Sequence, residues 1–379
     1  MKKIAIIGSG IAGLACAYKL HKKYEITLFE KNSYLGGHAH TVKVESKGET
    51  FEFDTGFMVY NEVTYPELTR LFRELEVQTT PTSMSFSVQH SPSGLEYCGS
   101  SYSKLFVQRK NLFRPQYYRF LLSIKRFNEE APKDLEDVYL DSLTLSDYVA
   151  QKKLGDDFLN LYLLPMSGAV WSAPAKEMLK FPAKTLLRFF YNHGFLGMYT
   201  QHPWRTVTGG SKQYVKILCA SFQDKIQLNH PILKIMAHEK SIEVCHQNGR
   251  QIFDSVILAC PATQALSLLP KTCEDERNLL SNFRYQNNPT LVHQDTSVMP
   301  QKKKAWASWN YRTDLLENNE MKGSTHYWMN SLQHIPKQHP FFVSLNAENF
   351  VDPEKILLKL DYEHPLFDQK AIEAQKKLP

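Results

Sequence analysis

The sequence lacks the cysteine and histidine patterns that mark structural metal sites and disulfide frameworks. Its six cysteines are scattered from Cys16 to Cys273, with no Cys-x-x-Cys pair and no Cys/His cluster at zinc spacing. Cysteines used in this way are typical of a reduced compartment. We therefore expect no metal and a cytoplasmic location.

The sequence also has no strong net charge, no excess of glycine or proline, and no long apolar run. The chain of 379 residues has a net charge of +6, which is too mild for a dedicated nucleic-acid binder. Its 17 glycines and 19 prolines are close to average usage, which excludes collagen-like and disordered chains. No run approaches the ~20 apolar residues of a transmembrane segment. The composition is that of a globular chain long enough for two lobes.

The amino terminus superficially resembles a signal peptide, because Met1-Lys2-Lys3 precedes an apolar stretch. Glycines interrupt that stretch, and residues 25–29 read as a β-strand that would lose its neighbour if the first segment were removed. A nucleotide-binding turn explains the same residues more completely than a cleaved leader does.

Residues 3–7, 11–20 and 25–29 read as strand, helix and strand, and Gly8-Ser9-Gly10-Ile11-Ala12-Gly13 lies at the first turn. Gly8 would permit the tight turn, Gly10 would let backbone N–H groups approach a pyrophosphate, and Gly13 would allow the helix to pack on the sheet. An acid at the end of the second strand is placed to bind a ribose diol. The alternative is a glycine-rich turn without a ligand. The candidate dinucleotide-binding residues here are Gly8, Gly10, Ile11, Ala12, Gly13, Glu30 and Lys31.

A second glycine pair, Gly36-Gly37, follows Glu30 within a few residues and would pass close to the same pyrophosphate. Nicotinamide dehydrogenases have no need for it. At this point the sequence resembles the FAD-dependent amine oxidoreductase superfamily, which includes monoamine oxidases, protoporphyrinogen oxidase and the phytoene desaturases. Many members carry an arginine after the glycine pair, where this chain has His38.

The resemblance implies FAD as cofactor and adds contacts beyond the glycine pair. Thr55 and Gly56 would lie beside the flavin, and the backbone at Ile232 would read the adenine. Ala259 and Pro261 would belong to a strand and turn near the cofactor.

Further segments, among them Asp54-Thr55-Gly56-Phe57 and residues 305–311, resemble a bacterial branch of this superfamily associated with cyclopropane fatty acid synthases. The branch adds a lipid-related molecule to the candidate substrates. Members of the superfamily typically finish with a glycine-rich strand-to-helix segment that closes the cofactor domain. No glycine follows Gly323, so we expect that closing segment to be missing.

The expected fold class is α/β, a Rossmann-like FAD-binding domain of the glutathione-reductase type with an inserted α+β substrate domain. Residues 1–80 and 205–268 would form the FAD-binding domain. Residues 81–204 would form a mostly helical insert, and residues 269–379 the strands and terminal helix of the substrate domain.

Weaker patterns leave two interpretations open. His38 and His40 would contact the flavin or shuttle protons; alternatively, one of them would only line the cofactor as a donor in place of arginine, while the other packs or faces water. His293 would lie under the flavin, or be an ordinary core or surface histidine. The aromatic residues of 306–328 would line an apolar cavity or form sheet core. The basic, aromatic stretch 106–127 would lie on an anionic membrane surface as a peripheral contact, or form a solvated helix face.

These patterns together predict an FAD-dependent oxidoreductase. It would take a hydride from an apolar or amine-bearing small molecule, with lipid-related molecules included, onto flavin N5. One alternative is a flavin-dependent isomerase or mutase, and another is a truncated, non-catalytic dinucleotide-binding protein. The sequence names no catalytic residue.

Overall fold

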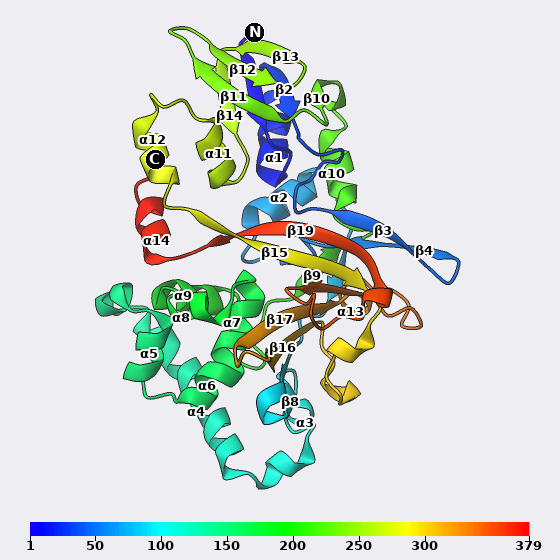
Figure 1. Ribbon diagram of the computed structural model, residues 1–379, viewed down its shortest axis with the longest axis vertical. Coiled ribbons are helices and arrows are strands. Elements are labelled where there is room, and N and C mark those ends of the chain that lie inside the picture. The colour runs from blue at the N-terminus through cyan, green and yellow to red at the C-terminus, as the bar shows by residue number, and fades with distance from the viewer. Residues whose placement is uncertain (379) are drawn as a thin grey trace.

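The two strands predicted at the amino terminus form the centre of a four-stranded parallel sheet in the order β10-β2-β1-β14. The computed structural model describes residues 1–378, and this sheet lies at the top of Figure 1. Apolar side chains point to both faces of β1, because a parallel sheet is covered on both sides. The strands are β1 (Lys3–Ile7), β2 (Glu25–Phe29), β10 (Ile226–Gln227) and β14 (Ser255–Leu258).

Different elements cover the two faces of this parallel sheet. Ile4 and Ile6 pack with Leu14 of one helix and Leu218 of another, whereas Ala5 and Phe29 pack beneath an antiparallel three-stranded sheet. The helices are α1 (Ile11–Leu20) and α10 (Lys212–Cys219). The antiparallel strands are β11 (Ile232–Ala237), β12 (Ile242–His246) and β13 (Gly249–Phe253), followed by α11 (Ala262–Leu268) and α12 (Glu274–Leu280).

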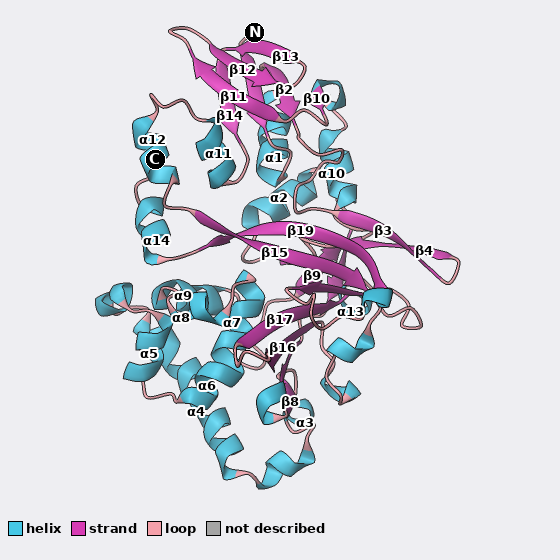
Figure 2. Ribbon diagram, viewed as in Figure 1, coloured by secondary structure: helices cyan, strands magenta, loops and turns pink. Residues whose placement is uncertain are grey.

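A seven-stranded sheet crosses the middle of the molecule in the order β19-β15-β18-β17-β16-β7-β8 (Figure 2). Its pairs are antiparallel except for β7 and β16, which run parallel. The strands are β7 (Phe86–His90), β8 (Leu95–Cys98), β15 (Arg284–His293), β16 (Trp309–Leu315), β17 (Met321–Trp328), β18 (Phe342–Leu345) and β19 (Ile356–Leu366).

Two small sheets and two helices connect the parallel sheet to the large one. One hairpin, β3 (Thr41–Ser46) and β4 (Glu49–Asp54), packs on the large sheet, where Val42 and Phe53 meet Phe341. The second small sheet has the order β5-β9-β6. These elements are β5 (Tyr60–Asn61), α2 (Pro66–Glu74), β6 (Thr79–Thr82), β9 (Trp204–Val207) and α13 (Met329–Leu332).

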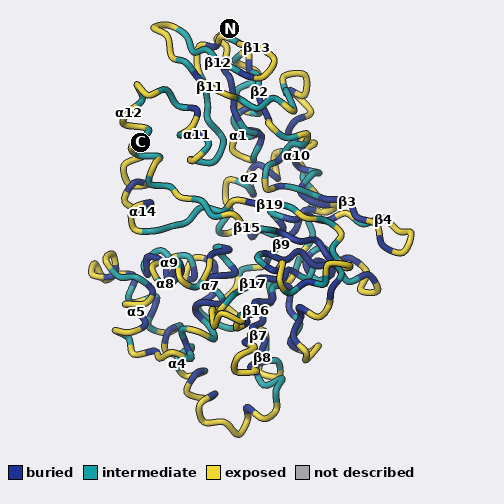
Figure 3. The backbone as a smooth tube through the Cα atoms, in the orientation of Figure 1, coloured by how far each residue is buried: buried dark blue, intermediate teal, exposed yellow. Residues whose placement is uncertain are grey.

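Helices fill the lower part of the molecule, around a core that contains Phe127, Phe158 and Phe190 (Figure 3). Residues 81–204 are largely helical, and they also supply β7 and β8 to the large sheet. The helices are α3 (Tyr102–Leu105), α4 (Pro115–Asp134), α5 (Leu145–Gln151), α6 (Asp156–Phe158), α7 (Leu164–Trp171), α8 (Ala175–Leu179), α9 (Ala183–Asn192) and, after β19, α14 (Gln369–Gln375). The α/β fold class predicted from the sequence is confirmed, and the division into domains stays a prediction.

Candidate functional site

The turn from β1 into α1 is built by glycines that cannot be replaced without collision. Gly8 has a φ of +103°, and its N–H donates to the Phe29 carbonyl at 2.9 Å. A Cβ on Gly13 would lie 1.9 Å from the Gly8 carbonyl oxygen. A Cβ on Gly8 would lie 2.5 Å from the oxygen of Ala259, so that β14 also borders this turn. The close packing predicted for Gly13 is therefore present.

Glu30 lies at the end of β2 and turns its carboxylate toward the glycine turn. Its Oε2 accepts from the Ser9 N–H at 2.9 Å and from the Ser9 hydroxyl at 2.6 Å, and its Oε1 accepts from the Asn32 N–H at 2.9 Å. The side chain is buried. These three donors fix the orientation of the buried Glu30 carboxylate.

The second glycine pair lies directly against the first turn. Gly36 donates to the Ser9 carbonyl at 3.0 Å, and Gly10 and Gly36 form a parallel bridge. A Cβ on Gly37 would lie 3.2 Å from the Gly10 Cα. The two glycine segments, separate in the sequence, are therefore one surface of bare backbone.

Thr55 and Gly56 continue this surface. Thr55 donates from its N–H to the His40 carbonyl at 2.9 Å, and a Cβ on Gly56 would lie 2.3 Å from the His38 carbonyl oxygen. Only glycine fits at position 56, because the following Phe57 N–H also donates to that His38 carbonyl at 2.7 Å.

A buried carboxylate fixes the strand that leads to Thr55. Asp54 accepts from the Ser211 N–H at 2.9 Å and from the Thr41 hydroxyl at 2.6 Å, and Gln333 donates to it at 2.6 Å. The group therefore ties β3, β4, α13 and the start of α10 together. Asp54 also satisfies a free N–H at the start of α10, a role that helix N-termini require.

The remaining candidates lie around this surface. Ile11 and Ala12 are exposed in the first turn of α1, and Lys31 is exposed beyond Glu30. Ile232 begins β11 beside a segment in which the His230 N–H donates to the Glu30 carbonyl at 2.8 Å. Pro261 precedes α11, two residues beyond Ala259.

Two side chains of β19 meet this surface and were not predicted. The Tyr362 hydroxyl lies 2.6 Å from the Thr55 hydroxyl and 2.9 Å from His40 Nδ1. The His364 ring stacks on His38, with centroids 5.4 Å apart. The signal was present in the sequence: over residues 358–363 apolar or aromatic residues alternate with charged ones, the period of a strand with one buried face.

Other candidates lie in the core instead. His293 is buried and bonds to Ser344 at 2.7 Å, on the face of the large sheet that packs against Phe342. Trp306 packs edge-on against Trp328, and Trp309 packs edge-on against Tyr327. For these side chains the structure favours the sheet-core interpretation.

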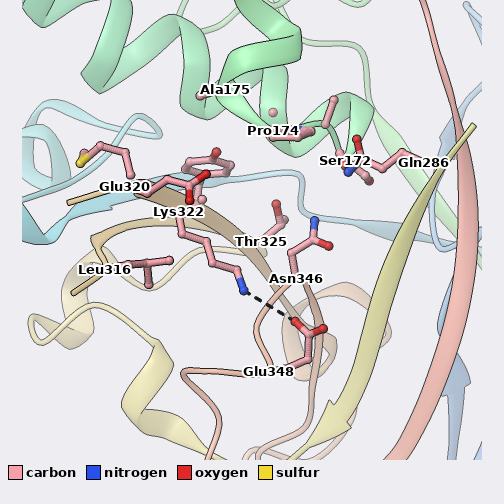
Figure 4. A pocket seen from close by; sticks show the side chains of 15 residues that line it. Ser172, Pro174, Ala175, Gln286, Leu316, Glu320, Lys322, Thr325, Asn346 and Glu348 are labelled. Atoms are coloured by element: carbon pink, nitrogen blue, oxygen red, sulfur yellow. Dashed lines mark hydrogen bonds and ion pairs between the residues drawn. The ribbon is translucent and has the colours of Figure 1, made fainter. Parts of the chain in front are cut away.

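A cavity of about 400 Å³ opens between α7, α8 and the large sheet (Figure 4). Tyr311 fits between two glycines in its wall, since Cβ atoms on Gly168 and Gly323 would lie 3.0 and 1.9 Å from its hydroxyl. Lys322 and Glu348 form an ion pair of 3.9 Å. The lining residues are Gly168, Ser172, Ala173, Pro174, Ala175, Gln286, Tyr311, Leu316, Glu320, Met321, Lys322, Gly323, Thr325, Asn346 and Glu348.

Hydrogen bonds connect this cavity to the glycine-pair surface. Asn288 donates from Nδ2 to the Ser172 carbonyl at 2.7 Å, which leaves its Oδ1 to accept from His364 Nδ1 at 3.0 Å. The His364 ring therefore carries its proton on Nδ1 and is neutral. Burial lowers the pKa of His364 to about 4, and His38 acts in the same direction.

Residues 1–378 contain neither a membrane-spanning helix nor a cluster of metal ligands. No helix among them has the length and apolar composition needed to cross a bilayer, and no three His, Cys, Asp or Glu side chains gather as ligands for a metal ion. All six cysteines are free thiols. The cytoplasmic location stays a prediction.

Comparisons with known proteins agree with this geometry. A family model described as flavin containing amine oxidoreductase matches residues 11–340. The 1-hydroxycarotenoid 3,4-desaturase of Flavobacterium sp. (strain P99-3) is 44% identical over 82 residues, which are 20% of this chain and only 15% of the desaturase.

Solved structures share the fold along nearly the whole chain. Cyclohexylamine oxidase from Brevibacterium oxydans IH-35A has a TM-score of 0.66 at 14% identity, over 98% of this chain and 90% of that one. The CLA-producing fatty acid isomerase from P. acnes has a TM-score of 0.67 at 15% identity, over 99% of this chain and 90% of that one. At such identities the likeness shows the fold alone, whereas the family match covers most of the chain. The chain therefore belongs to the flavin containing amine oxidoreductase family, and its cofactor is FAD.

Proposed function

We propose that this chain is an FAD-dependent oxidoreductase whose cofactor lies along the two glycine segments and whose substrate lies in the cavity beside β15. The observation that carries the proposal is the contact between the Gly8–Gly13 turn and the Gly36–Gly37 pair, with the Glu30 carboxylate beside them.

The glycine turn has the properties that a pyrophosphate requires. A Cβ on Gly10 would meet nothing within 4 Å, so this side of the turn is open. In the described part of the chain, no side chain caps the N-terminus of α1, and its first turn contains no acidic residue. Free N–H groups and the positive end of the helix dipole favour phosphate binding there, alongside Ile11, Ala12 and Gly13.

The adenosine end would lie beside Glu30. Three donors occupy part of its carboxylate, and the remaining lone pairs can accept from a ribose hydroxyl. Lys31 and the start of β11 at Ile232 border the same edge of the sheet, since the segment before β11 is bonded to Glu30.

The flavin end would lie along Gly36, Gly37, His38, Thr55 and Gly56, with Ala259 and Pro261 on the β14 side. His38 stands where many relatives carry arginine. Its exposed ring, held by His364, offers an imidazole donor in place of a guanidinium.

The cavity fits a small molecule with an apolar body and a polar or cationic group. Tyr311, Leu316 and Met321 supply the apolar wall. Two carboxylates, Glu320 and Glu348, line the cavity with one ammonium, that of Lys322, which pairs with Glu348. In Figure 4 the polar groups Ser172 and Gln286 lie beside β15, and Glu320 lies on the opposite side of the cavity. FAD, when bound, supplies a hydride acceptor at flavin N5.

The residues of this chain position the substrate and keep the path from the cavity to the glycine pair free of positive charge. Asn288, held by the Ser172 carbonyl and by His364, connects the cavity wall to the glycine pair. A neutral His364 leaves that path without a fixed positive charge, which suits a substrate that becomes cationic as it loses hydride.

Isomerisation without net oxidation is the second candidate, because a fatty acid isomerase shares this fold over 99% of the chain. Anaerobic mixing of the purified protein with aliphatic amines and with unsaturated fatty acids separates the two reactions. Lasting loss of the flavin absorption supports oxidation. Product formation with the absorption unchanged would contradict oxidation and support isomerisation.

A further inference from the structure

The end of the molecule farthest from the parallel sheet presents large apolar side chains to solvent. Phe113 is 87% exposed, Tyr102 is 68% exposed and Leu122 is 62% exposed. They belong to α3, the turn at 109–113 and the first half of α4, which form the bottom of the molecule in Figures 1 and 3. Single exposed apolar residues are ordinary, but a group of them at one end of a molecule marks an interaction surface.

A hydrogen bond joins two of the segments that carry these side chains. Tyr118 donates from its hydroxyl to the Leu112 carbonyl at 3.0 Å, which joins the 109–113 turn to α4. Tyr118 and Leu122 are one helical turn apart and both exposed, whereas Tyr117 and Phe120 face a buried core. The outward face of α4 therefore carries apolar side chains while its inward face already has a core. We call the surface of Tyr102, Leu112, Phe113, Tyr118 and Leu122 the α3–α4 tip.

The charge around the α3–α4 tip has one sign. Residues 97–128 contain seven lysines and arginines and no aspartate or glutamate. The run Lys302–Lys304 adds three more, and its Lys304 ammonium donates to the Ser103 hydroxyl beside α3 at 2.6 Å. These ten positive charges exceed the +6 of the whole chain, so the rest of the molecule is net negative.

Acidic groups neutralise only part of this charge: Glu129 and Glu130 form ion pairs with Lys125 and Arg126 in the second half of α4. Glu96 is buried and accepts from the N–H groups of Gln301 and Lys302. Asp157 accepts from Gln116 at the edge of α4. The cationic groups of the tip are Lys104, Arg109, Lys110, Arg114, Arg119, Lys125, Arg126, Lys302, Lys303 and Lys304.

We propose that the α3–α4 tip docks on the surface of an anionic lipid bilayer. Exposed apolar side chains on segments rich in lysine and arginine match the two layers of such a surface, because the apolar groups enter the acyl boundary while the cations stay at the headgroups. An acidic protein or nucleic acid would use the charges but would leave Phe113 and Leu122 in water. The docking does not depend on the reaction proposed above.

Vesicle co-sedimentation of the full chain tests the proposal. Vesicles of phosphatidylglycerol and phosphatidylcholine should retain the protein, and vesicles of phosphatidylcholine alone should retain far less. The double variant Phe113→Ser/Leu122→Ser keeps every charge and should bind the anionic vesicles about tenfold more weakly. The matched control is Leu233→Ser/Ile252→Ser, which removes side chains of similar exposure, 59% and 64%, at the opposite end of the molecule. It should bind like the unchanged protein.

A second variant tests the contribution of the positive charges. Arg109→Glu/Lys110→Glu/Arg114→Glu should also lose anionic vesicle binding, and thermal melting of each variant checks that it is folded. The proposal is overturned if the unchanged protein stays in the supernatant with anionic vesicles. It is equally overturned if the Phe113→Ser/Leu122→Ser variant binds as well as the control, because the surface would then recognise charge alone.

Discussion

The imidazole rings of His38 and His364 stack with centroids 5.4 Å apart and an interplanar angle of 12°. His38 follows the second glycine pair, and His364 lies on β19, more than three hundred residues later. Since His364 also donates to Asn288 of β15, one ring joins the glycine-pair surface to the strand that borders the cavity. The His364 ring therefore contacts both the glycine-pair surface and the strand that borders the cavity.

Removing this ring should weaken cofactor retention. We expect His364→Ala to bind FAD about threefold to tenfold more weakly, the magnitude of a lost aromatic pair, because His38 would lose its support. Titration of the FAD-free protein with FAD measures the change. His238→Ala removes an exposed histidine from the distant β11–β12 turn and should leave the affinity unchanged. Equal affinities of the two variants would show that the stack does not serve the cofactor.

The first glycine turn should not tolerate a methyl group. In Gly13→Ala the new Cβ would lie 1.9 Å from the Gly8 carbonyl oxygen, so α1 must move away from the turn. We expect a loss of roughly 2–3 kcal/mol in the free energy of unfolding and no FAD retained on purification. Gly99→Ala, where a Cβ meets nothing within 4 Å, is the control and should change neither property. A flavin-loaded Gly13→Ala protein would contradict the proposed phosphate site.

The carboxylates of the cavity should matter for cationic substrates alone. With Glu320→Gln/Glu348→Gln, we expect the KM of an aliphatic amine to rise about twofold to fivefold, the range of partly exposed ion pairs, with kcat nearly unchanged. A neutral substrate should keep its KM. Glu354→Gln, outside the cavity, provides the matched control. An unchanged KM for amines in the cavity variant would place the substrate elsewhere.

A chain of buried histidines predicts sensitivity to acid. The Asp295 N–H donates to His293 Nδ1 at 3.1 Å, so the His293 Nε2–H donates to Ser344 at 2.7 Å. The Ser344 hydroxyl then donates to His326 Nδ1 at 2.7 Å, and His326 Nε2–H donates to Ser324 at 3.0 Å. Protonation of either ring would place a hydrogen on the Nδ1 that now accepts, and so would break the bond from the Asp295 N–H to His293 or from the Ser344 hydroxyl to His326.

The stability should therefore fall as the pH falls. Burial lowers the pKa of His293 to about 4 and that of His326 well below its ordinary value. The unfolded chain takes up these protons near pH 6.5, while the folded chain does not, so the unfolded state binds more protons between about pH 6.5 and pH 4. Each ring contributes up to about 1.4 kcal/mol per pH unit in that window, and nothing above it.

Denaturant unfolding at a series of pH values measures this slope. The variant His293→Gln/His326→Gln should be less stable at pH 7 but should show a shallower slope between about pH 6.5 and pH 4. His238→Gln, an exposed histidine, should keep the slope of the unchanged protein. A slope that the double variant leaves intact would mean that other groups dominate the acid response.

The sequence predicted local elements well where one short pattern decides them. The Gly8–Gly13 turn and the two strands beside it depend on neighbours within thirty residues, and the structure has them in place. The aromatic segments after residue 284 form β15 to β18. The sequence did not identify long-range partners: the group that satisfies the Ser211 N–H at the start of α10 is Asp54, 157 residues earlier.

The strand β19 likewise has a partner that its own sequence does not identify. Its alternation of apolar or aromatic with charged residues over 358–363 was a usable signal for a strand. Nothing in that signal names the partner of the strand, and its pairing with β15 over ten residues brings Tyr362 and His364 to Thr55 and His38. The candidate site therefore contains two side chains that only the fold could supply.

Whether the glycine segments and Glu30 hold FAD is tested by the absorption spectrum of the purified protein, followed by analysis of what it releases on denaturation. We expect flavin absorption and the release of FAD, with a rise in the melting temperature when FAD is added to protein that has lost it. A colourless protein whose melting temperature does not respond to FAD would contradict the cofactor site formed by the glycine segments and Glu30, and with it the proposed reaction.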